Sequence, residues 1–370
     1  MKVLHVYRTY FPDTQGGGEE VIRQICLNSK SLGAECRVIS ICANPDPSVI
    51  TLEEAEVYRF KRTFAVASTD VSVDLLKHYA SLLSWADIVH FHFPWPFADL
   101  LQLLHRTNKP AIVTYHSDVV RQKPLMLLYR PLMRSLLNRV DRIVATSPGY
   151  AESSVELQRY RDKLEVIPIG LNEANYPAPD QVLLDKVEAQ LGGAGFFFFV
   201  GVLRYYKGLQ FLLNAVEDTG LRCVIAGTGP EEKNLHRIAR EKGLDNVQFV
   251  GRITDAEKAA MYQLCRAVVF PSHLRSEAFG VTLVEGSMAG KPLISAEIAT
   301  GTSYVNIDGE TGIVVPPADS KALREAMVKL AQNRSLAEEL GSAARERYQS
   351  QFTGEKMGGA YVALYQQLLH

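Results

Sequence analysis

Short apolar segments alternate with longer segments of helical periodicity along this chain. The first half contains apolar runs at residues 3–7, 36–40, 88–91, 111–115 and 142–145. The second half contains apolar runs at residues 196–201, 222–227, 247–251, 267–270, 292–295 and 312–315. Short apolar runs separated by amphipathic helical segments are typical of parallel strands in doubly wound α/β sheets. The pattern therefore predicts an α/β protein with two Rossmann-like domains in succession.

Turn-forming residues mark the expected boundary between these domains. Pro168 and Gly170 are followed by Pro177 and Pro179, a composition that favours a connector over a regular element. We therefore expect a first domain at residues 1–170, a linker at 171–195 and a second domain at 196–353. Apolar residues recur at helical spacing near the end of the chain, which predicts a last helix within residues 354–370.

Length, charge and cysteine content limit the function classes. The chain has 370 residues, and its 40 basic and 41 acidic side chains nearly balance, which argues against a nucleic-acid-binding protein. Its five cysteines show no disulfide or C-x-x-C spacing, so we expect a reducing, cytoplasmic environment. The first residues do not resemble a signal peptide, and no apolar run approaches the roughly 20 residues of a membrane span. We expect a soluble or peripheral protein.

A pair of glutamates, Glu277 and Glu285, carries the strongest chemical signal. The pair lies where the apolar run 267–270 gives way to a segment of helical character at 281–289. Backbone N–H groups at the start of a helix lack intrahelical partners and suit an anionic diphosphate. Those of this segment belong to Ala278, Phe279, Gly280 and Val281. Glu277 would face a sugar beyond the diphosphate, and Glu285 would face the same cleft from deeper down. Taken alone, the two could also be ordinary surface glutamates.

Two basic residues, Arg204 and Lys207, follow the apolar run 196–201. The carboxyl ends of parallel strands are where open α/β sheets bind ligands. The sequence contains no Asp-x-Asp motif that could hold a divalent ion, so fixed cations would neutralise a departing diphosphate. This interpretation predicts a site that needs no metal and no other cofactor. The alternative is a solvated pair of surface charges.

Glycines and histidines mark the first domain. Gly16 and Gly17 belong to a glycine triplet between the first apolar run and a helical segment at 19–32, where backbone could approach a ligand closely, although glycines also form ordinary turns. His116 ends the apolar run 111–115, again at a carboxyl edge. His90 and His92 lack an accompanying carboxylate or cysteine set for a metal, and we interpret them as core or acceptor-cleft residues.

Together, Glu277-x7-Glu285 and the Arg204-Tyr-Tyr-Lys207-Gly208 segment resemble the retaining nucleotide-sugar glycosyltransferases of family 4, over nearly the whole chain. The resemblance implies the GT-B fold, in which two Rossmann-like domains face a cleft and the last helix crosses back to the first domain. It also implies metal-independent chemistry. Gly16 and Gly17 would cover the donor phosphates, and His116 and Glu277 would be the catalytic residues that contact the donor sugar. Glu285 would hold the ribose.

The resemblance also suggests a donor. Arg252, in Gly251-Arg-Ile253, would lie near the nucleotide base. Similarity to bacterial O-antigen and surface-polysaccharide mannosyl- and rhamnosyltransferases, around 275–280 and 301–305, favours GDP-mannose, although Tyr304 stands where the wider family often has a glutamate. A UDP-sugar such as UDP-GlcNAc or UDP-glucose is the alternative donor. A nucleotide-sugar epimerase or a non-catalytic nucleotide-binding subunit are alternative functions.

The acceptor is expected to be a saccharide, carried on a lipid. Residues 121–142 contain several arginines and many leucines, and the acidic residue Asp141 lies only at the end of the segment. Such a basic amphipathic helix could bring a peripheral enzyme to an anionic membrane surface at the inner face of the cytoplasmic membrane. Equally, its apolar face could pack into the first domain with the arginines solvated. The residues concerned are Arg121, Lys123, Arg130, Arg134 and Arg139 on the basic side, and Leu125, Leu128, Leu132, Met133 and Leu136 on the apolar side.

Overall fold

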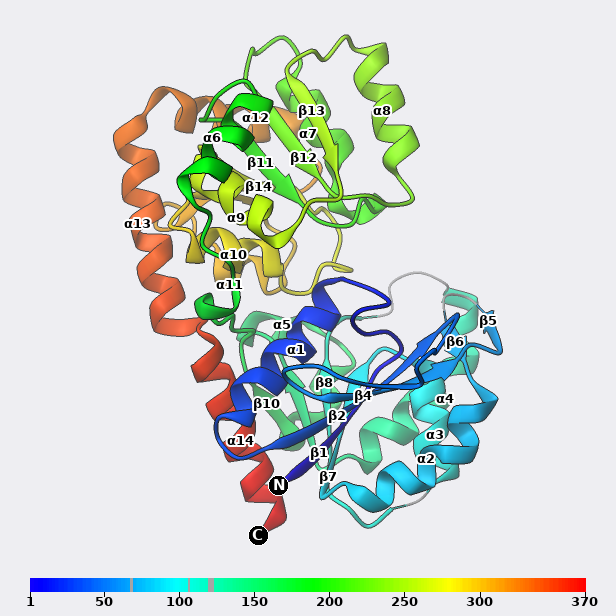
Figure 1. The fold of residues 1–370 in the computed structure, drawn as a ribbon. Coiled ribbons are helices and arrows are strands. Elements are labelled where there is room, and N and C mark those ends of the chain that lie inside the picture. Colours follow the sequence, from blue (N-terminus) through cyan, green and yellow to red (C-terminus); the bar gives the residue numbers. More distant parts are fainter. Residues whose placement is uncertain (67–68, 106, 119–122) are drawn as a thin grey trace. The chain divides into compact units, whose positions relative to one another are not determined.

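The computed structural model describes residues 1–66, 69–105, 107–118 and 123–370, and the chain divides into two compact units (Figure 1). One unit comprises Met1–Gly170 together with Gly354–His370, and the other comprises Leu171–Thr353. The segment 171–195, expected to be a linker, is part of the second unit and contains helix α6 (Gln181–Gln190). Asp180 caps this helix by accepting a hydrogen bond from Leu183 N, a start signal that the prolines before it obscure.

The first unit is built on an eight-stranded sheet with the order β10-β9-β8-β7-β1-β2-β4-β3. All its pairings are parallel except that of β3 with β4. The strands are β1 (Lys2–Val6), β2 (Glu35–Cys42), β3 (Val49–Thr51), β4 (Glu56–Lys61), β7 (Ile88–Phe93), β8 (Ala111–Tyr115), β9 (Arg142–Ala145) and β10 (Leu164–Val166). A separate antiparallel hairpin joins β5 (Phe64–Val66) and β6 (Thr69–Val71). Strand order reverses beside β1, since β2 and β7 flank it.

Helices cover this sheet. They are α1 (Gly17–Lys30), α2 (Val73–Trp85), α3 (Pro96–Leu104), α4 (Lys123–Arg139), α5 (Pro148–Ser153), η1 (Leu157–Lys163) and α14 (Gly354–Leu369). The last of them, α14, packs against α1. Gly358 permits this close approach, because a Cβ there would lie 2.5 Å from Asn28 Cβ. Tyr361 and Tyr365 of α14 are fully buried.

The second unit has a six-stranded, all-parallel sheet with the order β13-β12-β11-β14-β15-β16. The strands are β11 (Phe197–Val200), β12 (Cys223–Ala226), β13 (Val247–Gly251), β14 (Ala267–Phe270), β15 (Leu293–Ala296) and β16 (Gly312–Val315). This is the doubly wound order in which ligands bind where the winding reverses, here between β11 and β14. Every strand predicted from an apolar run is found, with its ends shifted by two residues or fewer.

The remaining elements of the second unit connect and flank these strands. They are η2 (Glu173–Asn175), η3 (Tyr205–Lys207), α7 (Leu209–Val216), α8 (Glu232–Glu241), α9 (Asp255–Leu264), α10 (Val281–Met288), α11 (Thr302–Val305), α12 (Ser320–Gln332) and α13 (Arg334–Gln351). The loops after β11 and β14 are neighbours at the point of reversal. They carry the basic and acidic residues singled out from the sequence.

Candidate functional site

The loop that follows β14 leads directly into α10 and carries Glu277. Gly280 is the N-cap of α10 and has a left-handed backbone (φ 91°), where a Cβ would lie 3.0 Å from Phe270 Cε1. Among the described residues, no backbone carbonyl accepts a hydrogen bond from the N–H groups of Ala278, Phe279, Gly280 or Val281. These donors lie at the positive end of the helix dipole, a combination that suits a phosphate group.

Lys207 and Glu277 form an ion pair at the same edge of the sheet. Lys207 Nζ lies 2.5 Å from Glu277 Oε2, and Ser272 Oγ donates to the same oxygen at 3.2 Å. Both charged side chains are about one-tenth exposed, and the Lys207 ammonium lies 4.5 Å from the centre of the Phe270 ring. A largely desolvated cation therefore lies beside a carboxylate, close to the helix start.

Gly208 makes this pairing sterically possible. Its backbone is left-handed (φ 70°), and a Cβ there would lie 2.0 Å from Pro271 O. The two loops are also joined by a hydrogen bond from His273 N to Tyr206 O at 3.0 Å. Arg204 begins the first of these loops and is exposed. The structure thus brings Arg204, Lys207 and Glu277 to one edge of the second sheet.

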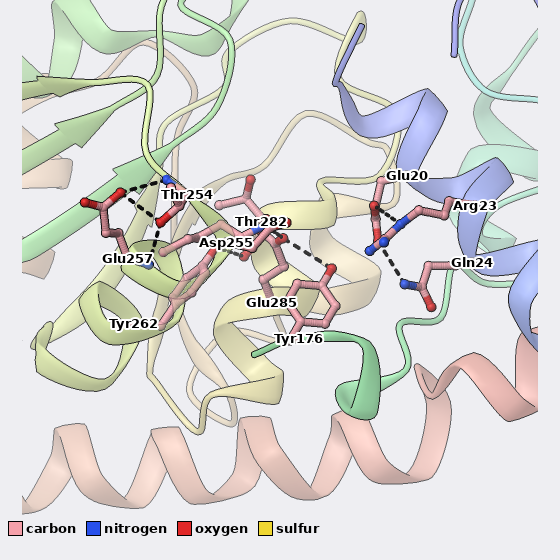
Figure 2. A network of polar contacts seen from close by, with 11 residues as sticks. Glu20, Arg23, Gln24, Tyr176, Thr254, Asp255, Glu257, Tyr262, Thr282 and Glu285 are labelled. Carbon is pink, nitrogen blue, oxygen red and sulfur yellow. Dashed lines mark hydrogen bonds and ion pairs between the residues drawn. The ribbon is translucent and has the colours of Figure 1, made fainter. Parts of the chain in front are cut away.

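Glu285 lies within helix α10, and a network of polar side chains holds its carboxylate (Figure 2). Its Oε1 accepts from Lys258 Nζ at 2.8 Å and from Tyr176 OH at 3.4 Å, and its Oε2 accepts from Tyr262 OH at 2.9 Å. Burial alone would lower the pKa of Lys258, but the carboxylates of Glu285 and Asp255 together outweigh it and raise that pKa. Burial, reinforced by Glu285, raises the pKa of Tyr262. The Lys258 ammonium and the Tyr262 hydroxyl therefore both keep their protons and donate to the buried Glu285 carboxylate.

Arg252 lies on the loop between β13 and α9, where its side chain is exposed. That loop ends in a capping box, in which Thr254 and Glu257 exchange hydrogen bonds at the start of α9. Lys258 then bridges Asp255, at 3.2 Å, and Glu285. The loop of Arg252 is in this way connected to Glu285 through α9. Sequence reasoning missed Lys258, Tyr262 and Tyr176, and only the helical spacing of Lys258 and Tyr262 could have indicated that they share a face.

In the first unit, the glycine loop follows β1. Gly16 is the N-cap of α1, with an extended backbone, and Gly17 is the first helical residue. A Cβ on Gly16 would lie 2.8 Å from Glu19 Oε2, and Thr14 Oγ1 donates to Glu19 Oε1 at 2.9 Å. The Glu19 side chain thus folds back over the loop.

His116 follows β8 and is half-buried. Its Nε2 shares a hydrogen bond of 2.9 Å with His92 Nδ1. Burial lowers the pKa of His116 to about 4, so the ring is neutral at physiological pH. Gly16, Gly17 and His116 belong to the first unit, whereas the acidic and basic candidates belong to the second.

His90 and His92 are buried in the first sheet, as core residues. Together with His5 they lie close enough to form a metal-ligand group, and a second such group joins His5 to Cys26 and Cys36. However, both ring nitrogens of His90 are hydrogen-bonded, to Tyr365 OH and Thr114 Oγ1, and both nitrogens of His92 are hydrogen-bonded to other histidines. Metal binding by this pair would have to break those bonds.

The apolar positions of helix α4 that were expected to share one face are not all buried. Met133 and Leu136 are buried and Leu132 is half-buried, but Leu128 is 81% exposed. Its neighbour Leu127, which was not assigned to that face, is 69% exposed. Arg134 is paired with Glu156 at 3.0 Å. Arg121 lies outside the described residues, as do the side chains of Lys123 and Leu125. Across the described parts of the chain, no helix is both long enough and apolar enough to cross a membrane.

Two family models match the chain. The model described as Glycosyltransferase Family 4 matches residues 15–175, and that described as Glycosyl transferases group 1 matches residues 184–347. The chain is 49% identical to D-rhamnosyltransferase WbpZ of Pseudomonas aeruginosa, over 95% of this chain and 92% of that protein. It is 46% identical to O-antigen chain mannosyltransferase C of Escherichia coli, over 100% of this chain and 99% of that protein.

Solved structures show the same fold. Sucrose-phosphate synthase from Thermosynechococcus elongatus superposes with a TM-score of 0.81 at 22% identity, covering 99% of this chain and 98% of that one. HepE of Anabaena, in complex with UDP and glucose, superposes with a TM-score of 0.82 at 17% identity, covering 99% of each chain. The predicted α/β architecture is confirmed and is the GT-B fold. The family matches and the two curated relatives show that this chain is a glycosyltransferase and belongs to glycosyltransferase family 4.

Proposed function

We propose that this enzyme transfers mannose from GDP-mannose to a hydroxyl of a lipid-linked oligosaccharide during O-antigen synthesis, with retention of anomeric configuration. The names of the two relatives, a mannosyltransferase of O-antigen chains and a D-rhamnosyltransferase, support the sugar and the process. The observation that carries the site is the Lys207–Glu277 ion pair near the start of α10, where four N–H groups donate to no backbone carbonyl of the described residues.

The two residues of that ion pair would contact different parts of the donor. The backbone donors of Ala278–Val281 and the ammonium of Lys207 would bind the diphosphate and stabilise the negative charge that develops as the glycosidic bond breaks. Arg204 would contribute a second cation. Glu277 would accept hydrogen bonds from sugar hydroxyls, and the departing phosphate oxygen would take the proton of the acceptor hydroxyl. With these cations in place, the chemistry would proceed without a metal ion.

Glu285 would bind the ribose. A carboxylate offers about four acceptor positions, and described side chains occupy three of those of Glu285. The bond from Tyr176 is the longest of them at 3.4 Å. A ribose hydroxyl would therefore take the free position and replace Tyr176, while Lys258 and Tyr262 keep the carboxylate in place. Arg252 would lie toward the base.

A thermal-shift panel without added metal tests the donor. Binding to the native state raises Tm by mass action, by the equivalent of about 2.7 kcal/mol at a hundredfold excess over Kd. GDP and GDP-mannose should raise Tm more than UDP, UDP-GlcNAc or UDP-glucose, and Glu285→Gln should reduce the shift. Preference for a uridine nucleotide would replace GDP-mannose by a UDP-sugar. Unchanged activity in EDTA, and an α-linked product from the α-linked donor, test metal independence and retention.

Helix α4 supports association with an anionic membrane surface. Leu127, Leu128 and Arg130 are all exposed, a combination that suits the headgroup region. Arg134 is a poor probe, because its replacement would break the pair with Glu156. The doubly substituted variant Leu127→Ser, Leu128→Ser should lose sedimentation with anionic vesicles. Val182→Ser, at an equally exposed site in the second unit, is the control. Equal sedimentation of both variants would contradict membrane binding.

A further inference from the structure

The first unit contains a line of histidine side chains that runs from its core to His116. His5 lies on β1, His90 and His92 lie on β7, and His116 follows β8. The first three are buried, with exposed fractions of 1% or less. Neighbouring rings are nearly parallel and lie edge to edge: the centroids of His5 and His92 are 5.4 Å apart, and those of His92 and His116 are 5.2 Å apart.

Three of these rings are joined end to end by hydrogen bonds. His5 Nδ1 lies 3.1 Å from His92 Nε2, and His92 Nδ1 lies 2.9 Å from His116 Nε2. Each such contact contains one proton, and a neutral imidazole carries one N–H. Burial lowers the pKa of both His92 and His116, so both are neutral at physiological pH. The two protons must consequently point the same way along the line.

The buried end of the line sets that direction. His5 Nε2 has no nitrogen or oxygen partner among the described atoms, and its polar neighbours are the sulfur atoms of Cys26 and Cys36. A hydrogen bond with Cys26, and a further one with His5, lower the pKa of the Cys36 thiol. A thiol sulfur is a weak acceptor and an imidazole nitrogen a better one, so the His5 proton is better placed on Nδ1, where it is donated to His92. A doubly protonated His5 would also donate from Nδ1, so the direction would be the same.

We infer that His5 and His92 are positioning residues that hold His116 in the tautomer protonated on Nδ1. With His92 donating from Nδ1, His116 Nε2 must accept, and the only proton of His116 is on its other nitrogen. No described residue forms a hydrogen bond with that Nδ1. The ring therefore presents a fixed N–H donor, suited to an oxygen of the donor sugar. This last role rests on the proposed function, whereas the tautomer does not.

Ring-nitrogen NMR of the full-length protein labelled with ¹⁵N-histidine tests the tautomer without substrate. Protonated and unprotonated imidazole nitrogens differ strongly in ¹⁵N chemical shift, and the His116 signals can be assigned by their loss in His116→Gln. Wild type should show Nδ1 protonated and Nε2 unprotonated. His92→Leu should release this restriction and give a mixture of tautomers. A wild-type His116 protonated on Nε2, or a tautomer that His92→Leu leaves unchanged, would overturn the inference.

Two further variants separate the line from general packing. His90→Leu removes a buried histidine whose hydrogen bonds go to Tyr365 and Thr114 and not to the line, so the His116 tautomer should persist. His92→Asn retains an N–H donor near the Nδ1 position and should restore the wild-type tautomer. If His92→Leu fails to fold, His5→Leu breaks the other end of the line and should give the same release.

Activity then tests the role of the proton. Loss of one neutral hydrogen bond corresponds to about a 2- to 10-fold fall in kcat/KM, expected for His92→Leu and largely recovered in His92→Asn. A correct tautomer with no such fall would remove the sugar contact from the inference. Failure of GDP-mannose as donor would affect the proposed function alone, because the NMR result is obtained in the free protein.

Discussion

The two units place polar chemistry at the carboxyl edges of their sheets in different ways. The second unit uses charged side chains on loops and helices, and pairs them: Lys207 with Glu277, and Lys258 with Glu285. The first unit uses imidazoles that lie within or next to its strands and hydrogen-bond to one another, and those of His92 and His116 are neutral. Charge needs a partner when it is desolvated, whereas a neutral ring needs only a donor and an acceptor. The two edges should therefore respond differently to substitution and to pH.

The largest effect should follow from removing Glu285. Glu285→Ala leaves the mostly buried Lys258 ammonium without its closest carboxylate, and breaking such a pair costs about 3 kcal/mol or more. We expect a loss of that size in the free energy of unfolding of the second unit, together with loss of the nucleotide-induced thermal shift. Urea denaturation measures the first and the thermal shift the second.

Two comparisons make this prediction specific. Glu257→Ala, on the same helix as Lys258, removes only an exposed capping interaction and should cost about 1 kcal/mol. The double variant Glu285→Leu, Lys258→Met removes both charges and should be more stable than Glu285→Ala. A double variant as unstable as the single one would mean that the ion pair does not account for the loss.

A glycine at the loop crossing should have the next largest effect. In Gly208→Ala, the new Cβ would overlap Pro271 O and also occupy a left-handed backbone position, so we expect destabilisation by more than about 3 kcal/mol. Gly220 is a matched control, because its φ is +67° and nothing lies within 4 Å of its Cβ position. Gly220→Ala should cost about 1 kcal/mol. Equal losses would show that backbone strain, and not the approach to Pro271, governs Gly208.

The contrast between the units also shows what the sequence could and could not predict. The apolar runs located the buried parallel strands, because continuous apolar sequence is required on a sheet covered on both faces. Strand β4, Glu56–Lys61, was missed, although its alternating burial is the period-two pattern of a half-exposed strand. The edge strands β3 and β10, with three residues each, carry too few positions for any period.

Only some of the candidate site residues could be predicted from the sequence. Arg204, Lys207 and Glu277 could be found because they follow apolar runs, at the strand ends where such sheets bind ligands, and Glu285 because of its fixed spacing from Glu277. Lys258 was missed because a lysine on an amphipathic helix is normally expected to be solvated. Only the folded structure brings it to Glu285. His5 was missed because one histidine in an apolar strand carries no signal until β1 and β7 are paired. Contacts between distant segments require the tertiary structure.

As pH falls, the first unit should begin to lose stability at a higher pH than most of the second unit. Burial lowers the pKa of His90, His92 and His116 below the ordinary 6.5. The unfolded chain then binds more protons than the folded one below about pH 6.5, so stability is present above that pH and is lost as pH falls toward the folded values, about 4 for His116. The slope approaches about 1.4 kcal/mol per pH unit for each histidine. Asp99, whose pKa burial raises to about 7, opposes them with one group of the opposite sign, so the three histidines still dominate.

In the second unit, His273 adds one group of the same sign, while hydrogen bonds from Thr254 lower the pKa of Glu257. The contribution of Glu257 is present above its ordinary pKa of 4.5 and is lost only as pH falls below it. Hydrogen exchange monitored from pH 7 to 5 should therefore show first-unit strands losing protection more steeply than second-unit strands. An equal loss of protection in the strands of both units would contradict this prediction.

The smallest effects should come from two adjacent glycines of α14. Gly358→Ala would place a Cβ against Asn28 of α1, where the nearest atoms are a Cβ and backbone, so that helix α14 must shift at a cost of about 1–3 kcal/mol. Gly359 has nothing within 4 Å of its Cβ position, and Gly359→Ala should stabilise the helix by about 0.5–1 kcal/mol. If urea denaturation gives changes of opposite sign in the free energy of unfolding of the two variants, close packing on α1 is what requires a glycine at position 358. Stabilisation by both would mean that α14 can yield, and that the first unit does not depend on this contact.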